Sequence, residues 1–130
     1  MKIQIEELND NGDLRGSSFS LPQPALDFVG PIADVHIACT LAGSIRGNHF
    51  HLRRREAIVI LPGTAWSLHW DLGEGVAIGH RSFDGKGAVL VLILPGCSHA
   101  VRNDGEAPLW LVACSSEKYD PAESVMRPVI

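Results

Sequence analysis

Four side chains that commonly bind metal ions occupy two short stretches of the sequence. His49 and His51 are two residues apart, Glu56 follows them, and His99 comes much later in the chain. Side chains two apart on a β-strand share one face, so the imidazoles of the first stretch can point the same way. A turn through residues 52–55 would let Glu56 open the next strand on that face. If a returning strand places His99 opposite, three imidazoles and one carboxylate converge.

Such a ligand set suits one divalent transition metal ion and leaves coordination positions open, as in catalytic or ligand-binding sites. Nitrogen and oxygen ligands fit zinc, iron, nickel, cobalt and manganese alike, so the residue types do not choose the metal. The plain alternative is that a histidine pair on a strand is an ordinary surface or core pair. The addition of Glu56 and His99 favours metal binding over that alternative.

Other side chains are candidates for contact with a substrate. His69 and His80 are the candidate catalytic acid–base groups, and Arg46, Arg81 and Trp70 are the candidate substrate-binding residues. A guanidinium fork such as that of Arg46 can bind a phosphate or carboxylate with two hydrogen bonds. The alternative for Arg46 is a turn arginine in solvent.

The stretch 65–71 alternates polar with aromatic and aliphatic residues, and the sequence leaves open which set faces a pocket. If the polar set faces inward, His69 lines the pocket. If the tryptophans face inward, Trp70 could stack on a sugar, although simple core packing of both tryptophans is the favoured interpretation. His36, on an earlier β-rich run, is interpreted as an ordinary strand residue.

The elements that must position these residues are strands. The 130 residues include 13 glycines and 8 prolines spread along the chain, and turn dipeptides such as Pro62-Gly63 and Pro95-Gly96 separate short β-rich runs. This pattern is typical of an all-β sandwich or barrel. We predict one all-β domain over residues 1–130, a jelly-roll barrel of two Greek keys. Its strands are expected at 2–8, 14–21, 34–41, 49–52, 57–61, 65–71, 76–83, 88–94, 100–103 and 109–115.

Composition excludes several classes of function. The formal net charge of −4 leaves no basic excess for a nucleic acid, and the apolar run 88–94 is far shorter than a membrane helix. The three cysteines, Cys39, Cys97 and Cys114, are odd in number and far apart, which indicates a reducing compartment rather than a disulfide framework. We therefore expect a soluble cytoplasmic protein that binds neither membranes nor nucleic acids.

The residues 43–63 resemble the first cupin motif, G-x5-H-x-H-x4-E-x6-G, at every position: Gly43, His49, His51, Glu56 and Gly63. Later, Gly96, His99 and Asn103 fit the second motif, G-x5-P-x-G-x2-H-x3-N, while Pro95 and Gly87 are each displaced by one place. The resemblance implies a cupin barrel that binds a metal ion through His49, His51, Glu56 and His99. A cupin barrel that keeps these residues without binding metal is the alternative.

A narrower resemblance rests on two short segments. Arg46 to His51, R-G-N-H-F-H, is similar to the R-G-N-H-x-H segment of two groups of cupins. One is the zinc-binding C-terminal domain of capsular-polysaccharide enzymes that epimerise 4-keto sugars, and the other is the sugar 3,4-ketoisomerases. Residues 117–121, E-K-Y-D-P, are similar to E-K-F-D-P of the capsular domain. The ketoisomerases mostly lack a glutamate at the position of Glu56, so this chain is more similar to the metal-binding group.

The resemblance implies an isomerase or epimerase acting on a nucleotide-linked keto sugar in surface-polysaccharide biosynthesis, with zinc as the favoured metal. The partner would be a small sugar-like molecule. Two alternatives stay open, a metal-dependent dioxygenase and a non-catalytic sugar- or metabolite-binding module, because cupins host many activities. Pairing of edge strands between two chains would protect those edges, so we also expect a twofold homodimer.

Overall fold

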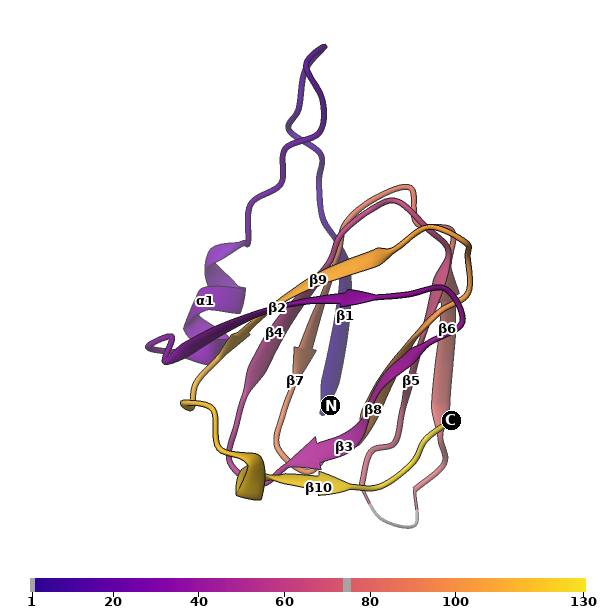
Figure 1. Cartoon of the computed structure of the whole chain (residues 1–130). Coiled ribbons are helices and arrows are strands. Elements are labelled where there is room, and N and C mark those ends of the chain that lie inside the picture. The colour runs from indigo at the N-terminus through magenta and orange to yellow at the C-terminus, as the bar shows by residue number, and fades with distance from the viewer. Residues whose placement is uncertain (1, 74–75) are drawn as a thin grey trace.

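Two antiparallel sheets packed face to face make up most of the computed structural model, which describes residues 2–73 and 76–130 (Figure 1). One sheet has the strand order β1-β7-β4-β9-β2, and the other has the order β10-β3-β8-β5-β6. The predicted all-β class is confirmed. The strands are β1 (Ile3–Glu7), β2 (Asp34–Thr40), β3 (Ile45–His51), β4 (Glu56–Ile60), β5 (Trp66–Trp70), β6 (Gly79–Phe83), β7 (Val89–Ile93), β8 (His99–Asn103), β9 (Leu109–Ser115) and β10 (Ser124–Met126).

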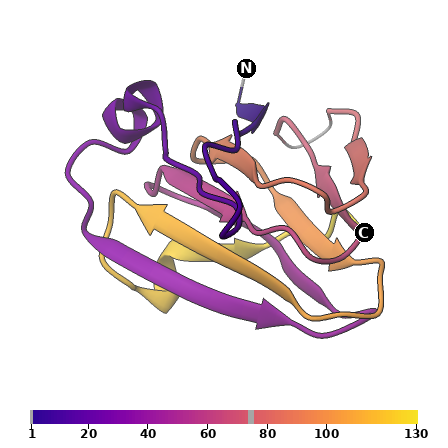
Figure 2. The ribbon, with the colours of Figure 1, turned by 90° about the horizontal axis from the view of Figure 1, so that it is seen from above.

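The first sheet is buried on both faces where β4 and β7 run through its centre. Ile58 and Ile60 point into the core between the sheets, whereas Ala57 and Val59 lie under the helix α1 (Gln23–Val29) on the outer face. Burial on both faces explains why β4 and β7 are continuous apolar runs rather than alternating ones. In the view from above, α1 lies to one side of the strands (Figure 2).

Three parts of the chain differ from the sequence prediction. Residues 14–21 do not form a strand, and this segment projects from the body as part of an arm (Figure 1). In the arm, the carboxylates of Asp10 and Asp13 accept hydrogen bonds from nearby backbone N–H groups. Such side-chain-to-backbone bonds compete with strand pairing. Helix α1 was not expected from its seven residues, and neither was β10, a short strand near the C-terminus.

The barrel is open on one side, since β2 ends the first sheet and only the short β10 extends the second sheet beyond β3. This opening gives solvent access to the space between the sheets. Within the described residues, no helix has the length and apolar character required to span a membrane.

Candidate functional site

An irregularity in β3 sets the direction of its side chains. The register against β8 shifts between Gly47 and His49, so Asn48 is an extra residue in the ladder. Such a bulge re-aims the side chains around it. Here it brings Arg46 to the same cavity as His49, although the two residues are three apart and would face opposite ways on a regular strand.

The residue types at the bulge follow from its geometry. Gly47 has φ of 100°, and a Cβ at this position would lie 2.5 Å from the carbonyl oxygen of His99. Asn48 has φ of 58°, a conformation that asparagine tolerates better than most residues, and its Oδ1 accepts a hydrogen bond of 2.9 Å from the backbone N–H of Val129. The R-G-N part of the R-G-N-H-F-H segment therefore builds the bulge.

Three imidazoles converge behind this bulge, as the sequence predicts. One ring nitrogen from each of His49, His51 and His99 lies within 4.8 Å of the others, and we call these residues the histidine group. Glu56 opens β4 on the facing sheet, and its Oε1 lies 2.7 Å from His51 Nε2 and 3.6 Å from His99 Nε2. The turn after β3 thus carries the carboxylate onto the same point as the imidazoles.

Hydrogen bonds behind the rings fix which nitrogens face this point. His51 Nδ1 lies 2.8 Å from Glu123 Oε1, and His99 Nδ1 lies 3.0 Å from the carbonyl oxygen of Cys97. A carboxylate and a carbonyl oxygen can only accept hydrogen bonds, so in each ring Nδ1 carries the proton. The unprotonated Nε2 of each ring then faces the point where the imidazoles meet Glu56. His51 Nε2 and Glu56 Oε1 are close but not in hydrogen-bond geometry, and neither has a hydrogen-bond partner among the described residues.

The charges of the group at neutral pH follow from its surroundings. Burial raises the pKa of Glu56, but the close contact with His51 and the positive charges of His99, His51 and Arg54 outweigh it and lower that pKa to about 2. Burial, then repulsion from His99 and His51, lowers the pKa of His49 to about 4. Burial also opposes charge on His51, yet the Glu56 and Glu123 carboxylates raise its pKa above the ordinary value. At neutral pH, Glu56 is therefore a carboxylate and His49 a neutral imidazole.

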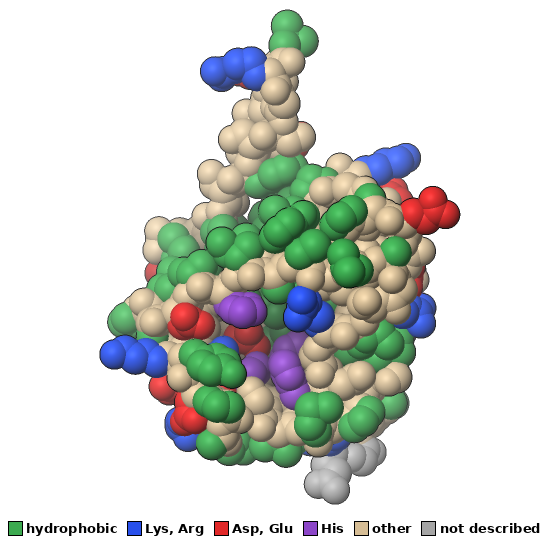
Figure 3. Space-filling view, viewed as in Figure 1, with side chains coloured by type: hydrophobic (Ala, Val, Ile, Leu, Met, Phe, Trp, Pro, Cys, Tyr) green, Lys and Arg blue, Asp and Glu red, His purple; other side chains and the backbone are tan. Residues whose placement is uncertain are grey.

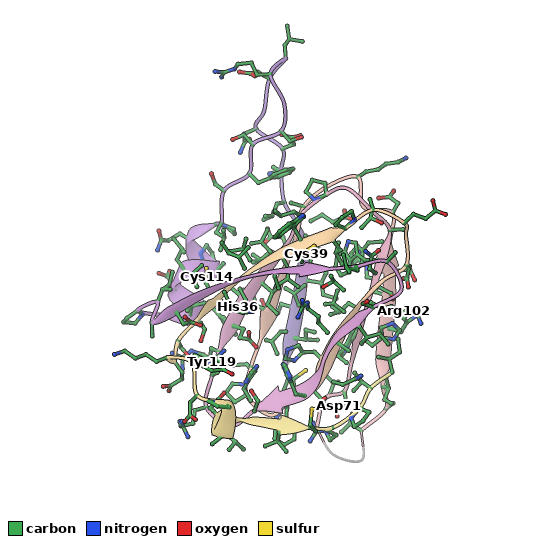
Figure 4. The ribbon with its side chains drawn as sticks, in the orientation of Figure 1. His36, Cys39, Asp71, Arg102, Cys114 and Tyr119 are labelled. Carbon is green, nitrogen blue, oxygen red and sulfur yellow. The ribbon has the colours of Figure 1, made fainter. Side chains whose placement is uncertain are left out.

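A cavity of about 190 Å³ opens between the two sheets beside this group. Figure 3 shows the opening as a hollow with histidine and acidic side chains at its base. Arg46 and His36 also line it, and His36 reaches it from β2, on the sheet opposite His49 and His99 (Figure 4). The lining side chains are His36, Ala38, Arg46, His49, Glu56, Ile58, His99, Val101, Leu111 and Ala113.

The structure separates the candidate catalytic residues His69 and His80 from the histidine group. Trp66 and Leu68 of β5 belong to the core between the sheets, so Ser67 and His69 take the outer face. His69 lies directly opposite His80 of β6, with ring centroids 4.5 Å apart, and its Nε2 is 2.9 Å from the hydroxyl of Ser67. Neither histidine lines the cavity, so the geometry gives no support to a base at these positions.

Of the candidate substrate-binding residues, only Arg46 lines the cavity. Trp70 packs against the core and covers Gly79, which is the core packing favoured from the sequence. Arg81 stacks over the ring of Phe83. Arg46 also donates to the carbonyl of Cys39 at 2.7 Å and to the hydroxyl of Thr40 at 3.1 Å, so it bridges β3 and β2.

Sequence reasoning missed two residues of the site. His36 was interpreted as an ordinary strand residue, and nothing in its local pattern distinguishes the cavity face from the outer face. Glu123 follows the E-K-Y-D-P segment by two residues, and that segment was the one signal pointing to this part of the chain. The structure places the Glu123 side chain, fully buried, behind His51.

Several solved structures share this fold. A 3′-monoepimerase from Streptomyces bikiniensis, ChmJ, solved with dTDP-quinovose, matches with a TM-score of 0.80 and 20% identity over 96% of this chain and 69% of that one. The RmlC epimerase of Mycobacterium tuberculosis matches with a TM-score of 0.78 and 18% identity, over 96% and 68% of the two chains. A 3,4-ketoisomerase from Helicobacter canadensis matches with a TM-score of 0.77 and 16% identity, over 96% of this chain and 90% of that one.

These neighbours are cupin jelly rolls, which confirms the predicted cupin fold. A comparison with curated proteins gave no match. A family model, described as the polysaccharide biosynthesis C-terminal domain, matches residues 29–125, which carry the bulge, the histidine group, Glu56 and Glu123. The chain is therefore a member of the polysaccharide biosynthesis C-terminal domain family, with an RmlC-like cupin fold.

Proposed function

We propose that this protein is a metal-dependent isomerase or epimerase that acts on a nucleotide-linked keto sugar in surface-polysaccharide biosynthesis. The observation that carries the proposal is a cluster of three imidazoles and one carboxylate, buried except for the half-buried His49. Three of its members, His49, His99 and Glu56, line a cavity that opens to solvent. The similar structures described as epimerases and ketoisomerases support the same class of reaction.

The residues fit a divalent metal ion. His51 Nε2 and Glu56 Oε1 are buried, lie 2.7 Å apart and lack hydrogen-bond partners among the described residues. Leaving such groups unpaired costs roughly 1–3 kcal/mol each, a cost that coordination of a cation would remove. His49, His51, His99 and Glu56 would hold the ion, and zinc is favoured, with iron, nickel and manganese as the other candidates.

A bound ion would supply an electrophile for the keto oxygen of the substrate, which acidifies the neighbouring C–H bond. The chain must then move a proton at that carbon. His36 is an imidazole outside the histidine group that lines the cavity, and it lies on the sheet opposite His49 and His99. We therefore assign proton transfer to His36 in place of His69 and His80.

The size of the cavity indicates which part of the substrate it holds. At about 190 Å³ it is smaller than the ~300–1,000 Å³ of most ligand pockets. The sugar would occupy the cavity, with apolar walls from Ile58, Val101 and Leu111 that exclude water, while the nucleotide lies across the opening. Arg46 at this opening offers a cation to the diphosphate.

The test is hydrogen exchange in the substrate. Protein purified without a histidine tag is analysed for metal and then incubated in D2O with TDP-4-keto-6-deoxyglucose, a ligand of one similar ketoisomerase structure. We expect zinc and the incorporation of deuterium at the carbon beside the keto group, detected by mass spectrometry. The variant His36→Asn should slow exchange, whereas the matched variant His69→Asn should not.

Other outcomes would contradict the proposal. Iron together with oxygen consumption would instead indicate a dioxygenase. Binding of the nucleotide sugar without exchange would indicate a non-catalytic binding module.

The proposal includes a twofold homodimer. The outer face of β2 and β9 exposes Val35, Ile37 and Trp110, which are 55%, 64% and 49% accessible, and Figure 3 shows a band of hydrophobic side chains above the hollow. Contiguous apolar surface of this kind often marks an interface. Sedimentation equilibrium should give twice the chain mass, and a monomer at micromolar concentration would contradict this part.

A further inference from the structure

The C-terminal segment, residues 120–126, delivers a carboxylate to the back of the histidine group. Asp120 accepts a hydrogen bond of 3.0 Å from the N–H of Ala122 and so starts the 3-10 turn η1 (Pro121–Glu123). The strand β10 then pairs with β3, with Ser124 opposite His51. The turn and the strand together place the side chain of Glu123 beneath His51.

Both oxygens of the Glu123 carboxylate have hydrogen-bond partners. Oε1 lies 2.8 Å from His51 Nδ1, and Oε2 accepts from the backbone N–H groups of Arg53 at 2.7 Å and Arg54 at 2.8 Å. The side chain is 0% exposed, and the buried Arg54 guanidinium, with Nε 3.7 Å from Oε1, offsets its charge. A carboxylate so completely buried and bonded has one orientation.

We propose that Glu123 is a positioning residue for the metal site, which holds His51 as the Nδ1-protonated tautomer and strengthens its Nε2 as a ligand. This inference rests on the metal site of the proposed function. A carboxylate accepts but cannot donate, so its bond to Nδ1 requires the proton there and leaves Nε2 free to bind a cation. Ionised acceptors behind a ligating histidine also increase its basicity.

His51 and His99 differ in this respect. The acceptor behind His99 is the neutral carbonyl of Cys97, at 3.0 Å, whereas the acceptor behind His51 is an ion. Ser124 Oγ is also near His51 Nδ1, at 3.1 Å, but a hydroxyl can donate or accept and so does not choose a tautomer. The charge of Glu123 is therefore what distinguishes His51 as a ligand.

The test measures zinc affinity of the metal-stripped full chain by competition with a chromophoric chelator. Glu123→Gln keeps the shape but can present an amide N–H to Nδ1, and it should weaken zinc binding roughly 10–100-fold. Glu117→Gln, which removes the same charge from a half-buried side chain just upstream, and Ser124→Ala should each stay within about threefold of the wild type. Equal affinity of Glu123→Gln and the wild type would overturn the inference.

A second measurement covers the case in which Glu123→Gln fails to fold. In the wild-type protein loaded with zinc, 1H–15N spectra of the histidine rings should show a slowly exchanging proton on Nδ1 of His51 and a metal shift on Nε2. Ligation through Nδ1 would overturn the inference. A wild-type chain that binds no zinc would instead refute the proposed function, so the two failures are distinguishable.

Discussion

Two sets of histidines lie on opposite faces of the same sheet. On the inner face, His49 of β3 pairs in register with His99 of β8. On the outer face, His69 of β5 pairs in register with His80 of β6. By spacing and proximity the two sets are equivalent, because each joins imidazoles directly across neighbouring strands.

The sets differ in the hydrogen-bond partners of their ring nitrogens. In the inner set, Nδ1 of His51 donates a hydrogen bond to the carboxylate of Glu123, and its Nε2 faces the carboxylate of Glu56. In the outer set, Nε2 of His69 already contacts the hydroxyl of Ser67 at 2.9 Å, and no carboxylate bonds to that ring among the described residues. The difference teaches that a candidate metal-binding histidine is recognised by the face of the sheet it occupies and by the partner of its second ring nitrogen, more than by a histidine on the next strand.

The strongest test of this comparison removes one histidine from each set. His51→Ala should weaken zinc binding by at least about 100-fold, since even loss of an outer partner costs 10–100-fold. With zinc at a hundred times its wild-type Kd, the wild type and His69→Ala should each gain about 2.7 kcal/mol in unfolding free energy, and His51→Ala at most about 0.4 kcal/mol. Urea unfolding with and without zinc measures the gain. Unchanged metal occupancy in His51→Ala would refute the ligand assignment.

A second test addresses the bulge at Asn48 in β3, the strand that carries His49 of the inner set. Gly47→Ala should destabilise the metal-free protein by about 1–3 kcal/mol, because the backbone is strained at φ of 100° and the methyl group would meet the carbonyl of His99. The control Gly87→Ala, with open space around its Cβ, should change stability by less than about 0.5 kcal/mol. Denaturant unfolding of both variants gives the values, and similar costs would show that the bulge is not constrained.

A third test separates the arginine that lines the cavity from the one that does not. Arg46→Met should weaken TDP binding about tenfold, equal to about 1.4 kcal/mol, while Arg81→Met should leave it unchanged. Isothermal titration calorimetry measures both. If the two variants lose affinity equally, the nucleotide does not lie at the cavity opening.

The smallest expected effect concerns pH. Burial, then repulsion from His80 and Arg102, lowers the pKa of His69, so below about pH 6.5 the unfolded chain binds more protons than the native one there. His69 therefore costs stability as pH falls, and His69→Asn should lose less stability than the wild type between about pH 7.5 and about pH 5.5. Urea unfolding of the metal-free proteins measures the difference.

The contribution of His51 to stability changes with pH in the opposite direction, and the same unfolding experiment can measure it. Its raised pKa means that the stability it contributes is present below about pH 6.5 and is lost as pH rises through the pKa of the folded state. His51→Asn should therefore lose more stability than the wild type on acidification. If the stabilities of His69→Asn and His51→Asn change equally with pH, the opposite pKa shifts assigned to the two histidines are wrong.

The sequence was sufficient to bring His49, His51 and Glu56 together because their spacing encodes both face and turn, whereas His99 was assigned from its fit to the second cupin motif on a returning strand. Two histidines two apart must share a face on a strand, and the residues between His51 and Glu56 must turn to reach the facing sheet. The parity of β5 was not predictable, because Trp66 and Leu68 on one face and Ser67 and His69 on the other give no local reason to choose. Packing against the rest of the core decided it.

The elements missed from the sequence all depend on distant contacts. β10 has three residues and exists through its pairing with β3, and α1 is a short helix stabilised where Ala25 and Val29 cover the first sheet. Short segments of this kind carry little periodicity of their own. The continuous apolar strands β4 and β7, by contrast, were correctly predicted because they are buried whatever their partners.

The C-terminal segment that contacts Asn48 and His51 bears on the order in which the parts of the fold assemble. The strands β1 through β9 pair with one another, and residues 120–130 add only β10 at the edge of β3, so both sheets can form before this segment docks. At that stage nothing holds the bulge from the side of Val129, and no acid lies behind His51. The barrel can thus form first, and the histidine group reaches its final geometry only when this C-terminal segment docks.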